Sequence, residues 1–174
     1  MRILFCLLLL TACNRSSVDS TAFFTQTNSE PTIAVLAVED EACTLSSLKI
    51  ADLLTAYVTR SVEQTTPLAL LQDKRDARYQ VNMQLIELQE IESSPSELSM
   101  SILLKVFDTR SGKVLLQEVL SVSTLLDKPL KPGANLSQNN KEFRISPLGL
   151  SSAKLSRKIA SRIEEAILTK GRTN

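Results

Sequence analysis

Residues 98–124, LSMSILLKVFDTRSGKVLLQEVLSVST, decide the fold of this chain. Apolar and polar residues alternate from Leu98 to Val106, which is typical of a β-strand with one face against a core. Asp108–Gly112 is typical of a tight turn, because its glycine is available for positive φ. From Val114 to Thr124 the chain returns as a second long strand. The stretch therefore predicts a β-hairpin.

A third long strand precedes the hairpin. Apolar and polar residues alternate from Tyr79 to Leu85, but Ile86 and Leu88 fall on the opposite parity. Either the strand carries a bulge near Leu85, or its far end is covered on both faces. Together the three strands predict an antiparallel meander.

The second face of this meander is partly apolar. Six apolar residues have the parity opposite to the main apolar set. An exposed patch of this kind usually marks a surface for a partner. The six are Ile86, Leu88, Leu103, Phe107, Leu115 and Val119.

The flanking segments complete one domain over residues 32–170. Thr32–Val38 is a continuous apolar run, typical of a strand covered on both faces. Residues 48–62 have the apolar spacing of a helix, residues 67–71 form a short strand that begins with a proline, and a second helix follows from Ser151. Residues 125–150 are rich in proline and glycine and predict a long irregular loop.

The order of these elements predicts an α+β fold. We expect a two-layer sandwich with a mostly antiparallel sheet of four to five strands and two helices packed on one face. Residues 13–174 are a normal length for a single domain with one core.

The amino terminus has the features of an export signal. Arg2 precedes an apolar run, Ile3–Leu10, that is too short to span a bilayer. The segment Leu10–Cys13 resembles the lipobox of bacterial lipoproteins, which implies removal of residues 1–12 and acylation of Cys13. Residues 13–31 then predict an acylated flexible tether, in which the role of Phe23 and Phe24 is open. Asn14 is not the aspartate of an inner-membrane retention signal, so the outer membrane is expected.

The composition argues against catalysis, cofactors and nucleic acid. The chain has no histidine, which removes the commonest general base and transition-metal ligand. There is no glycine-rich phosphate loop and no cysteine pair at metal spacing, and Cys43 is expected to be a small buried side chain. We therefore expect no enzyme, no cofactor and no metal. A formal net charge of +1 does not favour nucleic acid.

Basic residues are concentrated in the carboxy-terminal part. Residues 13–127 carry 9 Lys/Arg and 16 Asp/Glu, whereas residues 128–174 carry 10 and 3. On a tethered protein such a segment fits an anionic partner, such as lipid headgroups or phosphorylated glycolipid. The alternative is an ordinary solvent-exposed helix face.

The chain resembles the LptE family, the lipopolysaccharide-assembly lipoproteins of Gram-negative outer membranes. The resemblance rests on the pattern and order of segments over most of the chain after residue 12, and no single motif carries it. It implies a lipid-anchored protein on the periplasmic side that plugs and helps to fold an LptD-type β-barrel and contacts lipopolysaccharide. The segments are LTAC, TIAVLAV, DKRDARYQVNMQLIEL, LLKVFDTRSGKVLLQEV and KLSRKIASRIEEAIL.

The hairpin sequence of this chain also resembles a pattern found in two other lipoprotein families. These are the curli-secretion lipoprotein CsgG and LpoB, which activates penicillin-binding proteins. Both usually carry more helical sequence before the strand at Arg78–Leu88, where this chain has only Thr65–Ala77. Fewer than 20 residues separate Cys13 from the first strand, which is a short reach for an activator that spans peptidoglycan.

Lipopolysaccharide phosphates would require lysine or arginine side chains that form charge-assisted hydrogen bonds. Arg110 and Lys113, at the turn of the meander, are the first candidates. The second set lies in the late loop and comprises Lys128, Lys131, Lys141 and Arg144.

Overall fold

The computed structural model describes residues 30–41, 50–91, 95–126 and 139–170. The expected signal peptide, nearly all of the tether and several single residues lie outside this part. Those residues are Cys13, Phe23, Phe24, Cys43, Lys128 and Lys131.

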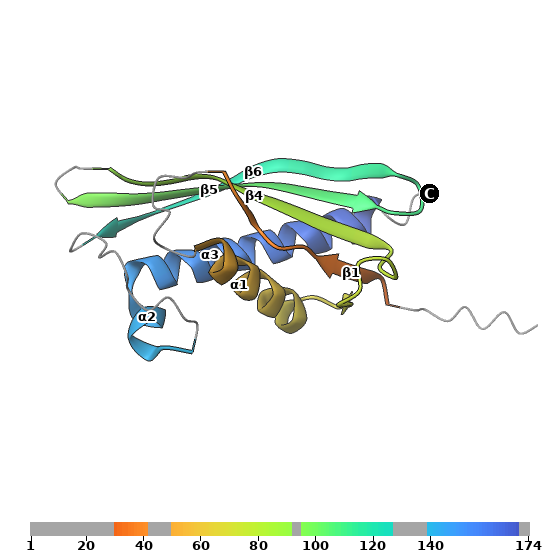
Figure 1. The fold of residues 1–174 in the computed structure, drawn as a ribbon, viewed down its shortest axis with the longest axis horizontal. Coiled ribbons are helices and arrows are strands. Elements are labelled where there is room, and N and C mark those ends of the chain that lie inside the picture. The colour runs from red at the N-terminus through yellow and green to blue at the C-terminus, as the bar shows by residue number, and fades with distance from the viewer. Residues whose placement is uncertain (1–29, 42–49, 92–94, 127–138, 171–174) are drawn as a thin grey trace, which may run out of the picture.

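The sheet forms one layer and the helices form the other (Figure 1). Its six strands follow the order β3-β1-β4-β5-β6, and β2 pairs with β4 beyond the end of β1. The three long strands form the expected antiparallel meander, whereas the short strands β1, β2 and β3 pair in parallel. The strands are β1 (Thr32–Val35), β2 (Glu39–Asp40), β3 (Ala69–Leu70), β4 (Tyr79–Ile91), β5 (Ser96–Asp108) and β6 (Lys113–Leu126).

The helices all lie on one side of the sheet (Figure 1). Helix α3 packs against β5 and β6, and α1 packs against β1 and β3. A π-helical turn, η1, continues directly from α3. The helices are α1 (Ile50–Thr65), α2 (Lys141–Ile145), α3 (Pro147–Glu165) and η1 (Ala166–Lys170).

The α+β class is confirmed, but the element counts are not. The sheet has six strands instead of four to five, and there is a third helix, α2, inside the segment expected to be an irregular loop. The predicted strand Thr32–Val38 ends at Val35, and the acidic residues after it supply β2. Helix α3 begins at Pro147 and not at Ser151, because Ser146 caps the helix and proline is favoured in its first turn.

Bulges in two of the long strands decide which side chains enter the core. The register between β4 and β5 shifts between Leu85 and Glu87, which confirms a bulge near Leu85. The register between β5 and β6 shifts at Val106/Phe107, so Leu115 has no partner in β5. These shifts turn Leu88 and Leu115 inward, where they are 3 % and 7 % exposed. Both residues were wrongly predicted to belong to the second face.

The core lies between the helices and the sheet face turned toward them, called the inner face below. Strand residues such as Met83, Ile102 and Leu104 are buried against Leu54 of α1 and Ile159 of α3 in one continuous apolar cluster. Each such side chain contributes about 1.5–3 kcal/mol when it leaves water. The opposite face of the sheet, the outer face, faces away from the helices (Figure 1).

Candidate functional site

Apolar side chains lie on the outer face of the meander toward the β5–β6 turn, where the polar row Asn82, Lys105 and Gln117 lies between them. Pairing across the strands places Gln84, Leu103 and Val119 side by side, and Phe107 lies beside Val114. Leu103 and Phe107 are half-buried, whereas Val114 and Val119 on the edge strand are 49 % and 54 % exposed. An exposed group of this kind is typical of a docking surface.

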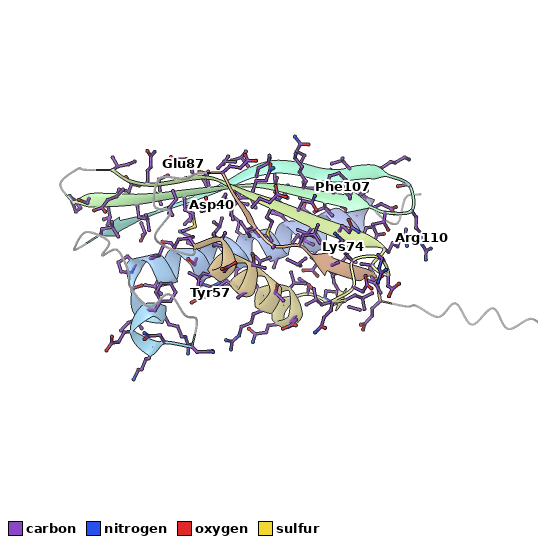
Figure 2. The ribbon with its side chains drawn as sticks, in the orientation of Figure 1. Asp40, Tyr57, Lys74, Glu87, Phe107 and Arg110 are labelled. Carbon is purple, nitrogen blue, oxygen red and sulfur yellow. The ribbon has the colours of Figure 1, made fainter. Side chains whose placement is uncertain are left out.

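The other half of the outer face is polar. The Ser101 hydroxyl donates to Glu87 Oε2 (2.7 Å) and lies 2.9 Å from the Ser121 hydroxyl, while the Ser99 hydroxyl donates to Glu87 Oε1 (3.3 Å). The hydrogen bond from Ser101 is the main reason why the pKa of Glu87 lies below its usual value. Figure 2 shows Glu87 and Phe107 along the sheet, with Tyr57 on the helical side. The outer face is thus not uniformly apolar.

The β5–β6 turn presents Arg110 at the end of the sheet (Figure 2), and Lys113 follows as the first residue of β6. Both side chains are exposed, and Gly112 adopts a φ of 67°, which favours glycine. The backbone N–H groups of Arg110 and Ser111 donate to Asp108 Oδ1 at 3.0 and 3.4 Å. The buried Asp108 carboxylate therefore fixes the turn that carries both candidate cations.

Burial alone would raise the pKa of the Asp108 carboxyl. The hydrogen bonds from Arg110 and Ser111, with the positive charge of Arg78, lower this pKa below its usual value instead. The ionised form is thus favoured in the folded state, and its contribution is lost as the pH falls through the folded pKa.

Asp108→Asn is expected to reduce the free energy of unfolding by about 1 kcal/mol at pH 7, because the hydrogen bonds lose their charge assistance. The difference between the wild type and the variant should narrow as the pH falls from 5 toward 3. Urea denaturation at a series of pH values measures it. A difference that stays constant down to pH 3 would show that the Asp108 charge does not contribute.

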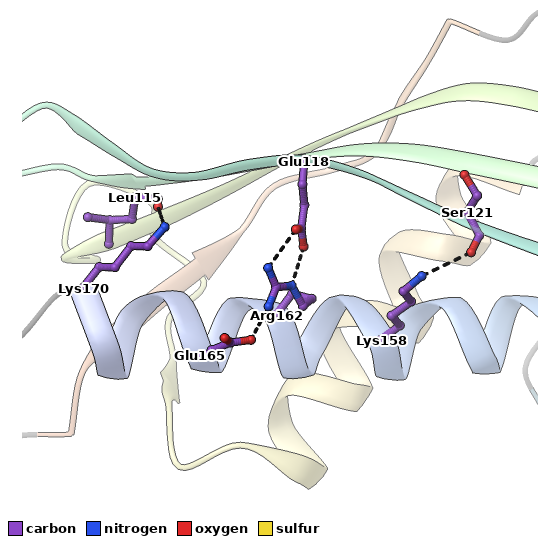
Figure 3. A network of polar contacts seen from close by, with 7 residues as sticks. All are labelled: Leu115, Glu118, Ser121, Lys158, Arg162, Glu165 and Lys170. Atoms are coloured by element: carbon purple, nitrogen blue, oxygen red, sulfur yellow. Dashed lines mark hydrogen bonds and ion pairs between the residues drawn. The ribbon is translucent and has the colours of Figure 1, made fainter.

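The basic side of the carboxy-terminal helix contacts the edge strand β6 (Figure 3). Lys158 Nζ donates to the Ser121 carbonyl oxygen (3.5 Å), and Lys170 Nζ donates to the Leu115 carbonyl oxygen (3.1 Å). Lysine side chains over an edge strand hinder pairing with another chain. Part of the basic stripe therefore has a structural role.

Arg162 lies between these two lysines and forms an ion pair with the Glu118 carboxylate (Figure 3). Its Nε and Nη2 atoms donate to the two Glu118 oxygens at 2.7 and 2.9 Å, and Nη1 contacts Glu165. This two-point hydrogen bond is the main reason why the pKa of Glu118 is lowered. The arginine therefore joins α3 to β6.

Replacing Lys158 and Lys170 together with alanine is expected to increase self-association through the β6 edge, because both side chains cover backbone carbonyl groups. Sedimentation velocity over a range of protein concentrations measures the effect. The matched control is Lys141→Ala/Lys154→Ala, which removes the same charge from exposed helical positions. Equal association of both variants would mean that net charge, and not edge protection, keeps the chains apart.

A cleft of about 380 Å³ lies where α1, α2 and α3 meet. It is lined by three exposed arginines, one from each helix: Arg60, Arg144 and Arg157. Tyr57 and Gln64 of α1 line it as well. Burial raises the pKa of the Tyr57 hydroxyl, while the charges of Arg144 and Arg60 act to lower it, which places both cations near this group.

The floor of the cleft is made of small polar side chains. The buried Ser61 hydroxyl donates to the Ser156 hydroxyl (3.1 Å), which donates to the Ala153 carbonyl oxygen (3.0 Å). Small side chains here let α1 and α3 approach closely. The crossing of the two helices thereby brings together arginines that are far apart in sequence.

The sequence identified only Arg144 of these three arginines. Tyr57, Arg60, Ser61 and Gln64 recur at three- and four-residue spacing in α1, and this pattern could have indicated one polar helix face. Whether these α1 residues lie close to Arg157 depends on how α1 and α3 cross, and the crossing cannot be predicted from the sequence.

The described residues contain no group of three or more Cys, Asp or Glu side chains that could hold a metal ion. Within those same residues, no helix is long and apolar enough to cross a membrane.

The comparisons with solved structures show a shared fold. The hypothetical protein CT253 from Chlamydia trachomatis superposes with a TM-score of 0.67 at 18 % identity, covering 79 % of this chain and 98 % of that one. Protein XCC0632 from Xanthomonas campestris, of the DUF330 family, gives 0.66 at 9 % identity, covering 83 % and 89 %. PelC from Paraburkholderia phytofirmans, a dodecamer, gives 0.55 at 12 % identity, covering 78 % and 89 %.

The amino-acid sequence was also compared with protein-family models and with curated proteins. No curated protein sequence matches the chain. Residues 79–171 match the model of a family of unknown function, DUF7499, from the first residue of β4 to just beyond η1. Because this match spans more than half of the chain, the chain belongs to the DUF7499 family.

Proposed function

We propose that this chain is a lipid-anchored binding protein of the outer membrane that assists lipopolysaccharide assembly. In this proposal Cys13 is acylated, and the outer face of the sheet docks against a β-barrel of the LptD type. The observation that carries the proposal is the group of apolar side chains on the outer face, with Val114 and Val119 about half exposed. The resemblance of the segment pattern to the LptE family supports the choice of partner.

Site-specific crosslinking tests the docking face. A photoreactive amino acid replaces Val119 on the outer face or, as control, Gln64, which is exposed on the helical side. The expected result is a crosslink from position 119, and not from position 64, to a protein that mass spectrometry identifies as an outer-membrane β-barrel. A crosslink from 119 to a peptidoglycan synthase would favour the LpoB-like alternative instead.

The lipid anchor is tested separately. Cys13→Ala is expected to abolish incorporation of labelled palmitate and to remove the protein from the outer-membrane fraction, because acyl chains supply the affinity for that membrane. Labelling that persists in this variant would contradict acylation at Cys13.

The contact with lipopolysaccharide is assigned to Arg110 and Lys113 at the turn. Replacing both with alanine is expected to weaken binding of purified lipopolysaccharide at least about tenfold, because each can form charge-assisted hydrogen bonds with phosphate. Unchanged binding would contradict this assignment. Lys128 and Lys131, from the second set of candidates, can be added to the same variant.

Self-association is a second candidate for the role of the outer face. It is favoured by PelC, which has a similar fold and is a dodecamer. In the crosslinking experiment it would appear as a ladder of products from position 119 that contain only this chain.

A further inference from the structure

The cleft on the helical side brings together cationic side chains from three helices. Arg60, Arg144 and Arg157 line one cleft, and no carboxylate in the described part of the chain forms an ion pair with any of them. The three ion pairs among the described residues involve Arg75 and Arg162, which do not line the cleft. Like charges held close together repel each other, so a bound anion would stabilise the arrangement.

One acidic side chain, Glu63 of α1, lies beside the cleft. Glu63 lines a neighbouring hollow that shares Arg60 and Gln64 with the cleft, but it does not line the cleft itself. Among the described residues, Arg157 donates only to the Ala153 carbonyl oxygen of its own helix, through Nε at 3.2 Å. The remaining N–H groups of Arg157 are therefore available to a ligand.

The lining groups suit an anion with several oxygen atoms. Guanidinium groups bind phosphate with two parallel hydrogen bonds, and three of them match a doubly charged group better than a single carboxylate. The Tyr57 hydroxyl and the Gln64 amide add neutral donors. A volume of about 380 Å³ is within the usual range of small-molecule sites and exceeds what a bare ion requires.

We propose that this cleft binds a phosphate monoester, with the phosphate between Arg60, Arg144 and Arg157. The remainder of the ligand lies toward Leu150, which is 57 % exposed on the rim. The phosphate comes from a lipid headgroup or from a soluble phosphorylated sugar.

This site does not depend on the proposed docking function. The cleft is formed by the helices, whereas the docking residues lie on the outer face of the sheet (Figures 1 and 2). Loss of barrel crosslinking and loss of phosphate binding can therefore be measured in separate variants, and either proposal can fail alone.

Calorimetric titration of the full chain in detergent micelles tests the proposal with three probes. Inorganic phosphate and glucose 1-phosphate represent the soluble source, and phosphatidic acid in mixed micelles represents the lipid source. The double variant Arg60→Gln/Arg144→Gln is expected to weaken probe binding at least about tenfold, because each arginine supplies charge-assisted hydrogen bonds. This expectation applies to each probe that the wild type binds. The matched control, Lys74→Gln/Arg75→Gln, removes two charges from an exposed turn and should change binding less than twofold.

Both double variants are first checked for unchanged circular dichroism and thermal midpoint, and Arg157→Gln replaces the first if it does not fold. The proposal is supported if the wild type binds a probe and only the cleft variant loses that binding. Binding of the soluble probes indicates a soluble ligand, and binding of phosphatidic acid alone indicates a lipid headgroup. Equal loss in both double variants would mean attraction to general surface charge and would overturn it. Absence of binding by all three probes would also overturn it.

Discussion

Replacing Leu104 with alanine is expected to lower the free energy of unfolding by about 3 kcal/mol. Leu104 is fully buried on the inner face of β5, between Met83 of β4 and Glu118 of β6 in the sheet register. The truncation removes its contacts with the helix layer and leaves a cavity that rigid strands cannot close. Urea denaturation followed by circular dichroism measures the change.

The adjacent residue provides the control. Leu103 belongs to the same strand and has the same side chain, but it lies half-buried on the outer face beside Val119. Leu103→Ala should cost clearly less than Leu104→Ala, about 1 kcal/mol, because Leu103 is partly exposed to water already. It should instead weaken the crosslink of position 119 to the barrel. If Leu103→Ala destabilises the chain as much as Leu104→Ala, the outer face is covered by protein and cannot be the docking face.

This pair of residues also shows how far the sequence predicts the fold. The alternation from Leu98 to Val106 assigns neighbouring residues to opposite faces, because a strand has a period of two. The prediction fails where a bulge adds a residue, since every later side chain then changes face. Alternation alone therefore misplaced Leu88 and Leu115, although the parity change at Ile86 indicated that a bulge was possible.

Strand β2 and helix α2 were not predicted, for a different reason. Strand β2 contains only Glu39 and Asp40, which are exposed and have low strand propensity. Backbone pairing with Gln84 and Leu85 of β4 holds them, so their conformation depends on a neighbouring strand and not on their own side chains. Helix α2 likewise depends on its contact with α3, in a segment whose prolines and glycines indicate a loop.

The candidate sites differ in how visible they are in the sequence. Arg110 and Lys113 were found because a hairpin turn is a local feature that brings neighbouring residues together. The cleft combines Arg60, Arg144 and Arg157 from three helices, and their proximity depends on tertiary packing. In the sequence Arg157 belongs to the basic side of one helix, which an ordinary solvent-exposed face would explain equally well.

The corner between α2 and α3 connects the cleft to the stability of the fold. The Ser146 hydroxyl donates to the Phe143 carbonyl oxygen (2.6 Å) and accepts from the Gly149 N–H (3.1 Å). This contact brings the Phe143 backbone against Gly149, where a methyl group would lie 2.0 Å from the Phe143 oxygen. Only glycine permits this approach, because the atom in the way belongs to the backbone.

Gly149→Ala is therefore expected to reduce the free energy of unfolding by about 2–3 kcal/mol, since α2 must move away from α3. The higher helix propensity of alanine, worth about 1 kcal/mol, offsets only part of the steric cost. The same movement displaces Arg144, so binding of the phosphate probe should weaken as well. Leu150→Ala, at the next and exposed position, should change stability by less than about 0.5 kcal/mol. If Gly149→Ala is as stable as the wild type, α2 does not pack this closely on α3, and Arg144 is not held at the cleft.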